Sequence, residues 1–113
     1  MTESAIDQAI FSELKEATGE DFVVELVQTF LEEATHMLAE LKQAVANSDA
    51  ESYRRAAHSI KSNANTFGAV GLAELARKIE LGSLPDAGDL GDAEALELEF
   101  NRSADALRSL IDD

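Results

Sequence analysis

The sequence has no cysteine, one proline and few aromatic residues, which make up 5% of its 113 residues. Without cysteine, the chain can form neither disulfide bonds nor thiolate metal sites, and it has no cysteine nucleophile. Only two histidines are present, which is fewer than the three or four ligands that a hydrolytic metal centre needs. The N-terminus lacks the pattern of a signal peptide, and nowhere do 18 apolar residues run together. We therefore expect a cytoplasmic protein.

Alanine, leucine and glutamate are abundant, and apolar residues recur with helical spacing along the whole chain. Residues 1–113 are predicted to form a single all-α domain, an antiparallel (up-down) four-helix bundle with an additional short N-terminal helix over one end. The first helix should end at Gly19, and Asp21 should cap the second. Asn47-Ser48-Asp49 should separate the second helix from the third, which should end at Gly68 in a left-handed conformation. An acidic connection from Gly82 to Asp92 should precede a last helix at 93–111.

Acidic residues dominate the charge, and the formal net charge is −14. Nucleic acids and anionic membranes are therefore not expected partners, because phosphate binding depends on lysine and arginine. The charge is uneven: residues 54–78 hold five of the nine basic residues and one acid, so this segment is +4 and the other 88 residues carry −18. This basic zone is either an ordinary solvated helix face or a surface for a phosphoryl group or an acidic partner.

His58 lies in the middle of this basic zone, in the segment predicted as the third helix. Because a helix turns about 100° per residue, one face should carry the imidazole with polar or small neighbours, and the opposite side should be buried. An exposed imidazole with an ordinary pKa of about 6.5 is mostly neutral and has one ring nitrogen free to attack phosphorus. The predicted solvent face carries Arg54, His58, Lys61, Ser62 and Asn65; the predicted buried side carries Tyr53, Ala56, Ile60 and Phe67, with Ala57 and Ala64 on its flank.

Known catalytic motifs are otherwise missing from the sequence. Glu33-x-x-His36 has the spacing of half a di-iron bundle motif, but the second half is missing because Arg55, not glutamate, stands three residues before His58. His36 lies off the apolar stripe of its helix, so we interpret it as a surface residue. The sequence contains no Gly-x-Ser-x-Gly, Walker or Gly-x-Gly-x-x-Gly motif, which argues against a hydrolase or a kinase.

The region around His58 resembles the signature of histidine-containing phosphotransfer (Hpt) domains. That family's pattern is Ala-His-x-Leu-Lys-Gly, a run of small residues, Gly-Ala, a downstream leucine, and an apolar–glutamate pair. The matching residues here are the run from Ala57 to Gly68, followed by Ala69, Leu72, Ala76 and Ile79-Glu80, while Asp21-Phe22, Leu26-Val27, Phe30-Leu31 and Asn47-Ser48-Asp49 extend the resemblance over nearly the whole chain.

The resemblance implies that His58 accepts a phosphoryl group from an aspartyl phosphate on a receiver domain and passes it to another receiver. Lys61 would stabilise the phosphate, and Mg²⁺ would belong to the receiver, so no cofactor is expected on this chain. The implied partners are response-regulator receiver domains and a hybrid sensor histidine kinase. We expect a monomeric phosphocarrier without kinase activity of its own.

The docking surface should surround His58 and include part of the second helix. Ser62 stands where the family usually has glycine, and its small size should leave room for the partner. Its hydroxyl would either contact the phosphate or face solvent on the helix surface. Arg54 and Arg55 would steer an acidic partner, and Asn65 would contact the partner, or cap the helix, or face solvent. The role of Asn63 stays open.

Two other functions remain as alternatives at this point. The chain could be the phosphoacceptor domain of a chemotaxis-type histidine kinase, which shares the bundle and a similar histidine motif. It could also be a non-catalytic regulatory helical bundle with an idle histidine. The start at Met1 and the end soon after the last predicted helix favour a free-standing protein, although an excised fragment would look alike.

Overall fold

The computed structural model describes residues 5–111, and every regular element in that range is a helix. None of these helices is both long and apolar enough to cross a membrane. The predicted all-α fold is confirmed. The helices are α1 (Gln8–Thr18), α2 (Glu20–Ala46), α3 (Ala50–Phe67), α4 (Val70–Leu81) and α5 (Gly91–Ile111).

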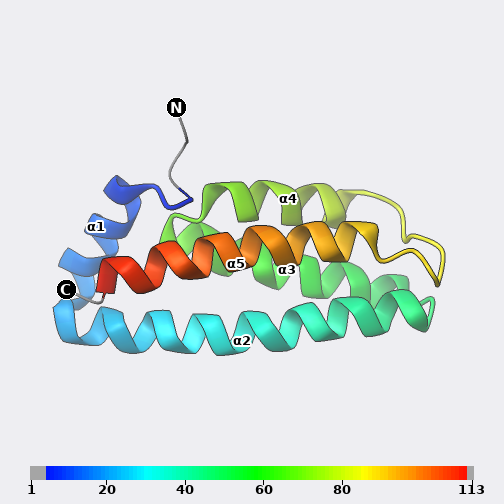
Figure 1. Ribbon diagram of the computed structural model, residues 1–113, viewed down its shortest axis with the longest axis horizontal. Helices are drawn as coiled ribbons and strands as arrows, with labels where there is room; N and C mark the ends of the chain where they lie inside the picture. Colours follow the sequence, from blue (N-terminus) through cyan, green and yellow to red (C-terminus); the bar gives the residue numbers. More distant parts are fainter. Residues whose placement is uncertain (1–4, 112–113) are drawn as a thin grey trace.

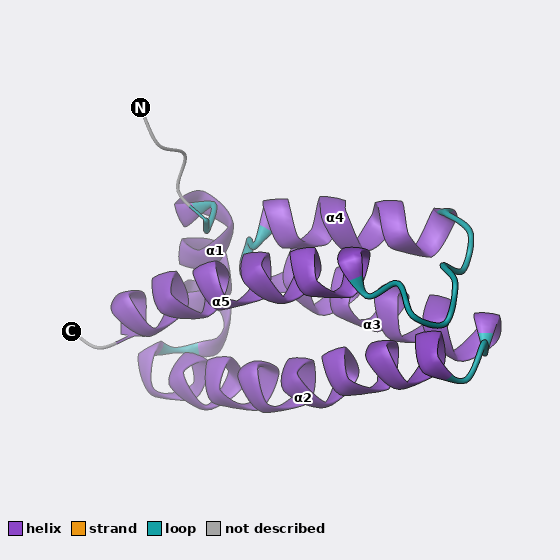
Figure 2. Cartoon of the chain, turned by 45° about the vertical axis from the view of Figure 1, so that its right-hand side comes forward, coloured by secondary structure: helices purple, strands orange, loops and turns teal. Residues whose placement is uncertain are grey.

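Helices α2 to α5 form an antiparallel bundle, and α1 covers one end of it (Figure 1). Helix α2 packs on α3, α3 on α4, α4 on α5, and α5 returns to α2, so the four helices close a ring around one core. Helix α1 crosses the end of the bundle and packs on α2 and α3. Figure 2 shows the short turns that join α2 to α3 and α3 to α4, and the longer loop before α5. The arrangement confirms the predicted up-down bundle with a covering N-terminal helix.

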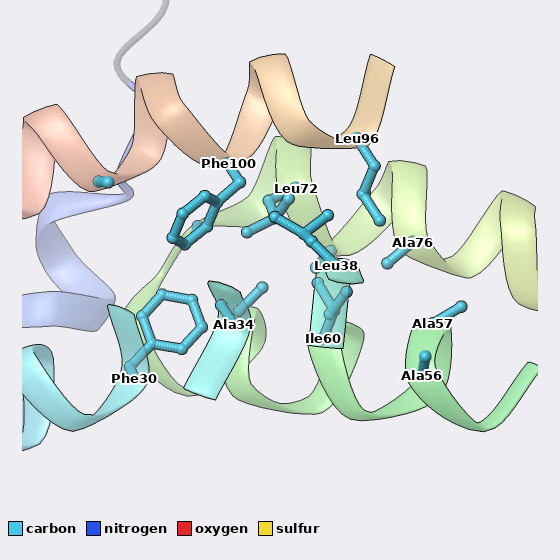
Figure 3. Packing of buried hydrophobic residues seen from close by; sticks show 14 of the residues in the cluster. Phe30, Ala34, Leu38, Ala56, Ala57, Ile60, Leu72, Ala76, Leu96 and Phe100 are labelled. Atoms are coloured by element: carbon cyan, nitrogen blue, oxygen red, sulfur yellow. The ribbon is translucent and has the colours of Figure 1, made fainter. Parts of the chain in front are cut away.

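The core is filled by the apolar faces of all four long helices (Figure 3). Phe30 of α2 stacks on Phe67 of α3 with ring centroids 4.8 Å apart, and meets Phe100 of α5 edge-on at 6.2 Å. The buried side chains of α3 and α4 include several small ones: Ala57 and Ala64 on α3, and Ala73 and Ala76 on α4. Because interhelical distance depends on the side chains at the contact, these alanines let α3 and α4 approach closely.

The prediction that Asp21 caps α2 is wrong. Helix α2 already begins at Glu20, and its N-cap position is Gly19, which has φ 94° and makes no side-chain capping bond. Gly19 also closes α1, where its N–H donates to the Lys15 carbonyl. A single residue thus joins two helices, and this leaves no extended residue for an aspartate cap. Asp21 instead lies in the first turn of α2, where its charge meets the positive end of the helix dipole.

The other helix ends are close to expectation. Asp49 caps α3, as predicted, and accepts hydrogen bonds from the backbone N–H and the hydroxyl of Ser52. These bonds hold the pKa of the Asp49 carboxyl below its ordinary value. Helix α5 begins at Gly91, two residues earlier than predicted, and Asp89 accepts a hydrogen bond of 3.0 Å from the Gly91 N–H.

Gly68 ends α3 in the predicted left-handed conformation, with φ 79°. Its carbonyl accepts a hydrogen bond of 2.7 Å from the backbone N–H of Asp7, the residue that caps α1. The end of the histidine-bearing helix is therefore also the anchor of the covering helix.

Candidate functional site

The His58 side chain projects from α3 into solvent, and 57% of its surface is exposed. The residues predicted for the opposite side of this helix, Tyr53, Ala56, Ile60 and Phe67, are all buried. Their burial fixes the rotation of α3 about its axis, so the imidazole is left on the outer face. The predicted exposure of the ring is confirmed.

A carboxylate from the neighbouring helix meets the imidazole. Glu80 of α4 places Oε2 at 2.8 Å from Nδ1 of His58. Its other oxygen, Oε1, accepts a hydrogen bond of 2.7 Å from Nζ of Lys61. One carboxylate therefore bridges the histidine and the lysine, and this bridge joins α3 to α4.

The protonation of Glu80 determines the tautomer of the histidine. The hydrogen bond from Lys61 is the largest influence on the pKa of Glu80; with the bond from His58 and the nearby charges, it outweighs partial burial and holds the pKa below its ordinary value of 4.5. An ionised carboxylate can only accept hydrogen bonds, so Nδ1 of His58 must carry the proton. In the neutral ring the lone pair then lies on Nε2, which makes no hydrogen bond within residues 5–111.

The position of Glu80 follows from the packing of α4. Leu72, Ala76 and Ile79 bury one face of the helix against the core. Glu80 comes directly after Ile79, so it lies at the edge of the buried face, and 21% of its side chain is exposed. The close approach of α3 and α4 brings this edge within reach of the imidazole.

Lys61 is less exposed than its place on the predicted solvent face suggested. Only 25% of its side chain is accessible, and its ammonium group is bonded to Glu80. The lysine lies at the boundary between α3 and α4 rather than on the open face. The histidine within the basic zone of residues 54–78 also has a carboxylate beside it, because Glu80 of α4 lies next to the ring.

The four other predicted site residues are exposed on α3. Arg54 forms no ion pair with any residue that the structure describes, whereas Arg55 lies 3.6 Å from Glu51 on the preceding turn. Ser62 and Asn65 form no side-chain hydrogen bond with other described residues. Asn63, whose role was open, donates from Nδ2 to the Ser59 carbonyl at 2.9 Å, a bond within its own helix.

A groove of about 260 Å³ runs between α2 and α3, and Ser59, the residue after His58, is part of its lining. His58 does not line this groove, so the predicted contribution of α2 to the docking surface stays a prediction. The second histidine, His36, lines this groove and is exposed, as predicted. Within residues 5–111 no group of three or more metal-ligating side chains is present. The groove is lined by Glu33, His36, Met37 and Glu40 from α2 and by Arg55, Ala56 and Ser59 from α3.

The model of the Hpt domain family matches residues 25–112. The chain belongs to the Hpt domain family. Its structure is similar to the crystal structure of histidine-containing phosphotransfer protein B (HptB) from Pseudomonas aeruginosa PAO1, with a TM-score of 0.76 and 29% sequence identity, over 98% of this chain and 94% of that chain. No curated protein sequence matches.

These comparisons confirm the predicted family and the predicted function class, a histidine phosphotransfer protein of a phosphorelay. Hpt domains are phosphocarriers that interact with receiver domains and kinases. In this Hpt domain the sequence signature had pointed to His58 and Lys61 but assigned no role to Glu80. The sequence feature that could have indicated a role for Glu80 is its position directly after Ile79, the last buried apolar residue of α4.

The ion pair in this Hpt domain predicts a pH-dependent contribution to stability. Because the pKa of Glu80 is lower in the folded chain than the ordinary 4.5, its contribution is fully present above that value and is lost as the pH falls through the folded pKa. Glu80→Gln should therefore lower the free energy of unfolding by roughly 1 kcal/mol at neutral pH, and by much less near pH 3. Urea unfolding of both proteins at the two pH values measures this.

The control is Glu74→Gln, an exposed position on the same helix without a hydrogen bond to another described residue. It should change stability little at either pH. A Glu80→Gln effect of equal size at pH 7 and pH 3 would contradict the predicted role of the ionised carboxylate.

Proposed function

We propose that His58 is the phosphoacceptor of this Hpt domain, and that it takes a phosphoryl group from the aspartyl phosphate of one receiver domain and gives it to another. The observation that carries this proposal is the exposed imidazole whose Nδ1 is engaged by Glu80. The nucleophilic nitrogen is then Nε2, on the side of the ring away from the carboxylate. A partner that docks on the outer face of α3 meets this nitrogen first.

Phosphoryl transfer to this nitrogen needs little further machinery on the chain itself. It depends on in-line approach and on stabilisation of the phosphate charge. The receiver domain supplies the aspartyl phosphate and holds the Mg²⁺, so no cofactor is assigned to this chain. With no nucleotide-binding motif in the sequence, we propose that the protein has no kinase activity of its own. A direct contact between Lys61 and the phosphate stays a prediction.

The proposed docking surface is the outer face of α3 together with the groove toward α2. Arg54 and Arg55 lie one turn before His58 and would attract an acidic partner surface. Ser62 and Asn65 lie after it, and Ser62 is small enough for partner loops to pass. Receiver domains fit this surface better than nucleic acid or anionic membrane, because the chain as a whole carries a charge of −14.

Other parts of the assignment remain predictions. A hybrid sensor histidine kinase is the expected upstream partner, and a monomer in the cytoplasm is the expected state of the protein. Size-exclusion chromatography with light scattering measures the oligomeric state directly.

The proposal is tested by supplying phosphate from two different donors. The protein is incubated with a radiolabelled phosphorylated receiver domain, and separately with labelled ATP and the catalytic domain of a chemotaxis-type histidine kinase. We expect label from the receiver within the mixing time of a manual assay. The label should be lost in acid and retained in base, as expected for a phosphorylated imidazole and not for a phosphorylated hydroxyl.

The other functions predict different results. Label from the kinase alone would identify a phosphoacceptor domain of a chemotaxis-type kinase. Label from neither donor, with a normally folded bundle by circular dichroism, would support a non-catalytic regulatory bundle.

A further inference from the structure

The two helices beside the groove at Ser59 carry charges of opposite sign. Helix α2 holds six acidic residues and one basic residue, a formal charge of −5, whereas α3 holds three basic residues and one acidic residue, a formal charge of +2. The phosphoacceptor role of His58 accounts for cations on α3, because they suit a phosphoryl group. It does not account for the acids on α2.

The groove at Ser59 continues toward the turn that joins α2 to α3. A second hollow of about 310 Å³ lies there, and it shares Glu40 and Arg55 with the first, so the two adjoin. Together they form the α2–α3 groove. Its lining includes the apolar side chains of Met37 and Ala56, which are partly or fully buried. The groove thus has an apolar part between two charged helices.

Two carboxylates on the α2 side of the groove have no cation beside them. Glu33 and Glu40 are exposed, and neither forms an ion pair or a side-chain hydrogen bond with another residue in the range 5–111. They are seven residues apart, which is two helical turns, so they share one face of α2 at a separation of about 10 Å. On the α3 side, Arg55 lies 3.6 Å from Glu51 of its own helix and does not neutralise them.

A partner that reaches His58 will also cover part of this groove. Ser59, the residue after His58, belongs to the groove lining. A stable protein interface covers about 800 Å² on each partner, a patch of roughly 16 Å radius, whereas packed helix axes are only about 8–10 Å apart. The α2 side therefore falls within the covered area. A carboxylate that is covered without a cation loses its hydration at a cost in free energy.

We propose that the receivers that exchange phosphate with this protein bring lysine or arginine side chains to Glu33 and Glu40, while their acidic phosphorylation pocket lies over α3. This inference rests on the proposed phosphoacceptor role of His58. A receiver that is acidic or uncharged at that place leaves two carboxylates covered and unpaired, so it is disfavoured. The two glutamates are therefore specificity-determining residues, which select receivers by charge.

The test reverses the charge of the α2 side. A variant that combines Glu33→Lys with Glu40→Lys is compared with the wild-type protein, using a phosphorylated receiver domain that transfers phosphate to the wild type. At about 50 mM salt, the second-order transfer rate should fall by about tenfold or more in the variant, because electrostatic steering is reversed. Most of the difference should disappear at about 500 mM salt, which screens exposed charges. The assays are run at about pH 8, where exposed histidines add no charge.

Two controls separate docking from other effects. A variant that combines Glu94→Lys with Asp105→Lys changes the net charge equally, at exposed positions of α5, which lies diagonally across the bundle from α3. Its transfer rate should stay within about twofold of the wild type. Phosphoramidate, a small phosphate donor that needs no docking surface, should phosphorylate His58 equally fast in all three proteins. Melting curves by circular dichroism check that each variant is folded.

The outcomes separate this inference from the proposed function. Equal or faster transfer in the Glu33→Lys and Glu40→Lys variant at low salt would overturn the inference, because the covering surface is then uncharged or acidic. An equal slowing in the α5 variant would overturn it too, in favour of an effect of net charge. Slower labelling by phosphoramidate would place the effect at His58 itself and not at docking. Failure of the wild-type protein to take phosphate from any receiver would instead refute the proposed function.

Discussion

We expect the His58→Gln variant to take up no detectable phosphate from a phosphorylated receiver, while the bundle keeps its stability to within about 0.5 kcal/mol. Glutamine has a polar side chain without a nucleophilic nitrogen, and it is at least as favourable in a helix as histidine. The side chain of His58 is 57% exposed, so its replacement opens no cavity in the core. The loss should therefore concern the chemistry and not the fold.

The second histidine of the chain provides the control for this experiment. His36 is exposed on α2 and lines the groove beside α3, but its ring has no ion pair or hydrogen bond within residues 5–111. His36→Gln should therefore accept phosphate at the wild-type rate. Remaining acid-labile label on His58→Gln, or its loss from His36→Gln, would show that the phosphoacceptor has been wrongly assigned.

The contact between His58 and Glu80 was beyond what the sequence could show, although both residues belong to the recognised signature. They lie 22 residues apart, on different helices. Helical periodicity gives the face of each helix but not the rotation of one helix against its neighbour. That rotation depends on how the buried side chains of α3 and α4 fit together, which is a property of packing and not of spacing.

The predicted exposure of the site residues has the same limit, because helical periodicity does not include the neighbouring helix. The angular positions on α3 correctly placed Tyr53 and Ile60 inside, and His58, Ser62 and Asn65 outside. The same argument put Lys61 on the open face, because it considers one helix alone. Once α4 is in place, Lys61 lies at the seam between the two helices and is mostly covered.

The predicted helix boundary was wrong where the turn between two helices is unusually short. A sequence search for a cap looks for aspartate, asparagine, serine or threonine before an apolar run, and Asp21 fits that rule. The rule assumes a stretch of extended chain before the helix. Between α1 and α2 the single residue Gly19 replaces that stretch, which only a residue without a side chain permits at φ 94°.

The largest effect on stability is expected from Gly68→Ala, at the end of the histidine-bearing helix. With φ 79°, an alanine here costs about 1–2 kcal/mol in backbone strain alone. The new Cβ would also lie 2.8 Å from the backbone oxygen of Asp7 and 3.2 Å from Cβ of Ile10, so α1 would have to shift, at a further cost of about 1–3 kcal/mol. We expect the free energy of unfolding to fall by about 2–5 kcal/mol.

Urea unfolding followed by circular dichroism measures this loss, with Gly88→Ala as the matched control. Gly88 lies in the exposed loop before α5, and an added Cβ there meets no atom within 4 Å, so this variant should be as stable as the wild type. Gly68 lies ten residues after His58 at the far end of α3, so Gly68→Ala that is still folded should accept phosphate normally. A loss below about 1 kcal/mol would mean that α1 moves aside easily, and that the hydrogen bond from Asp7 to Gly68 does not hold the covering helix in place.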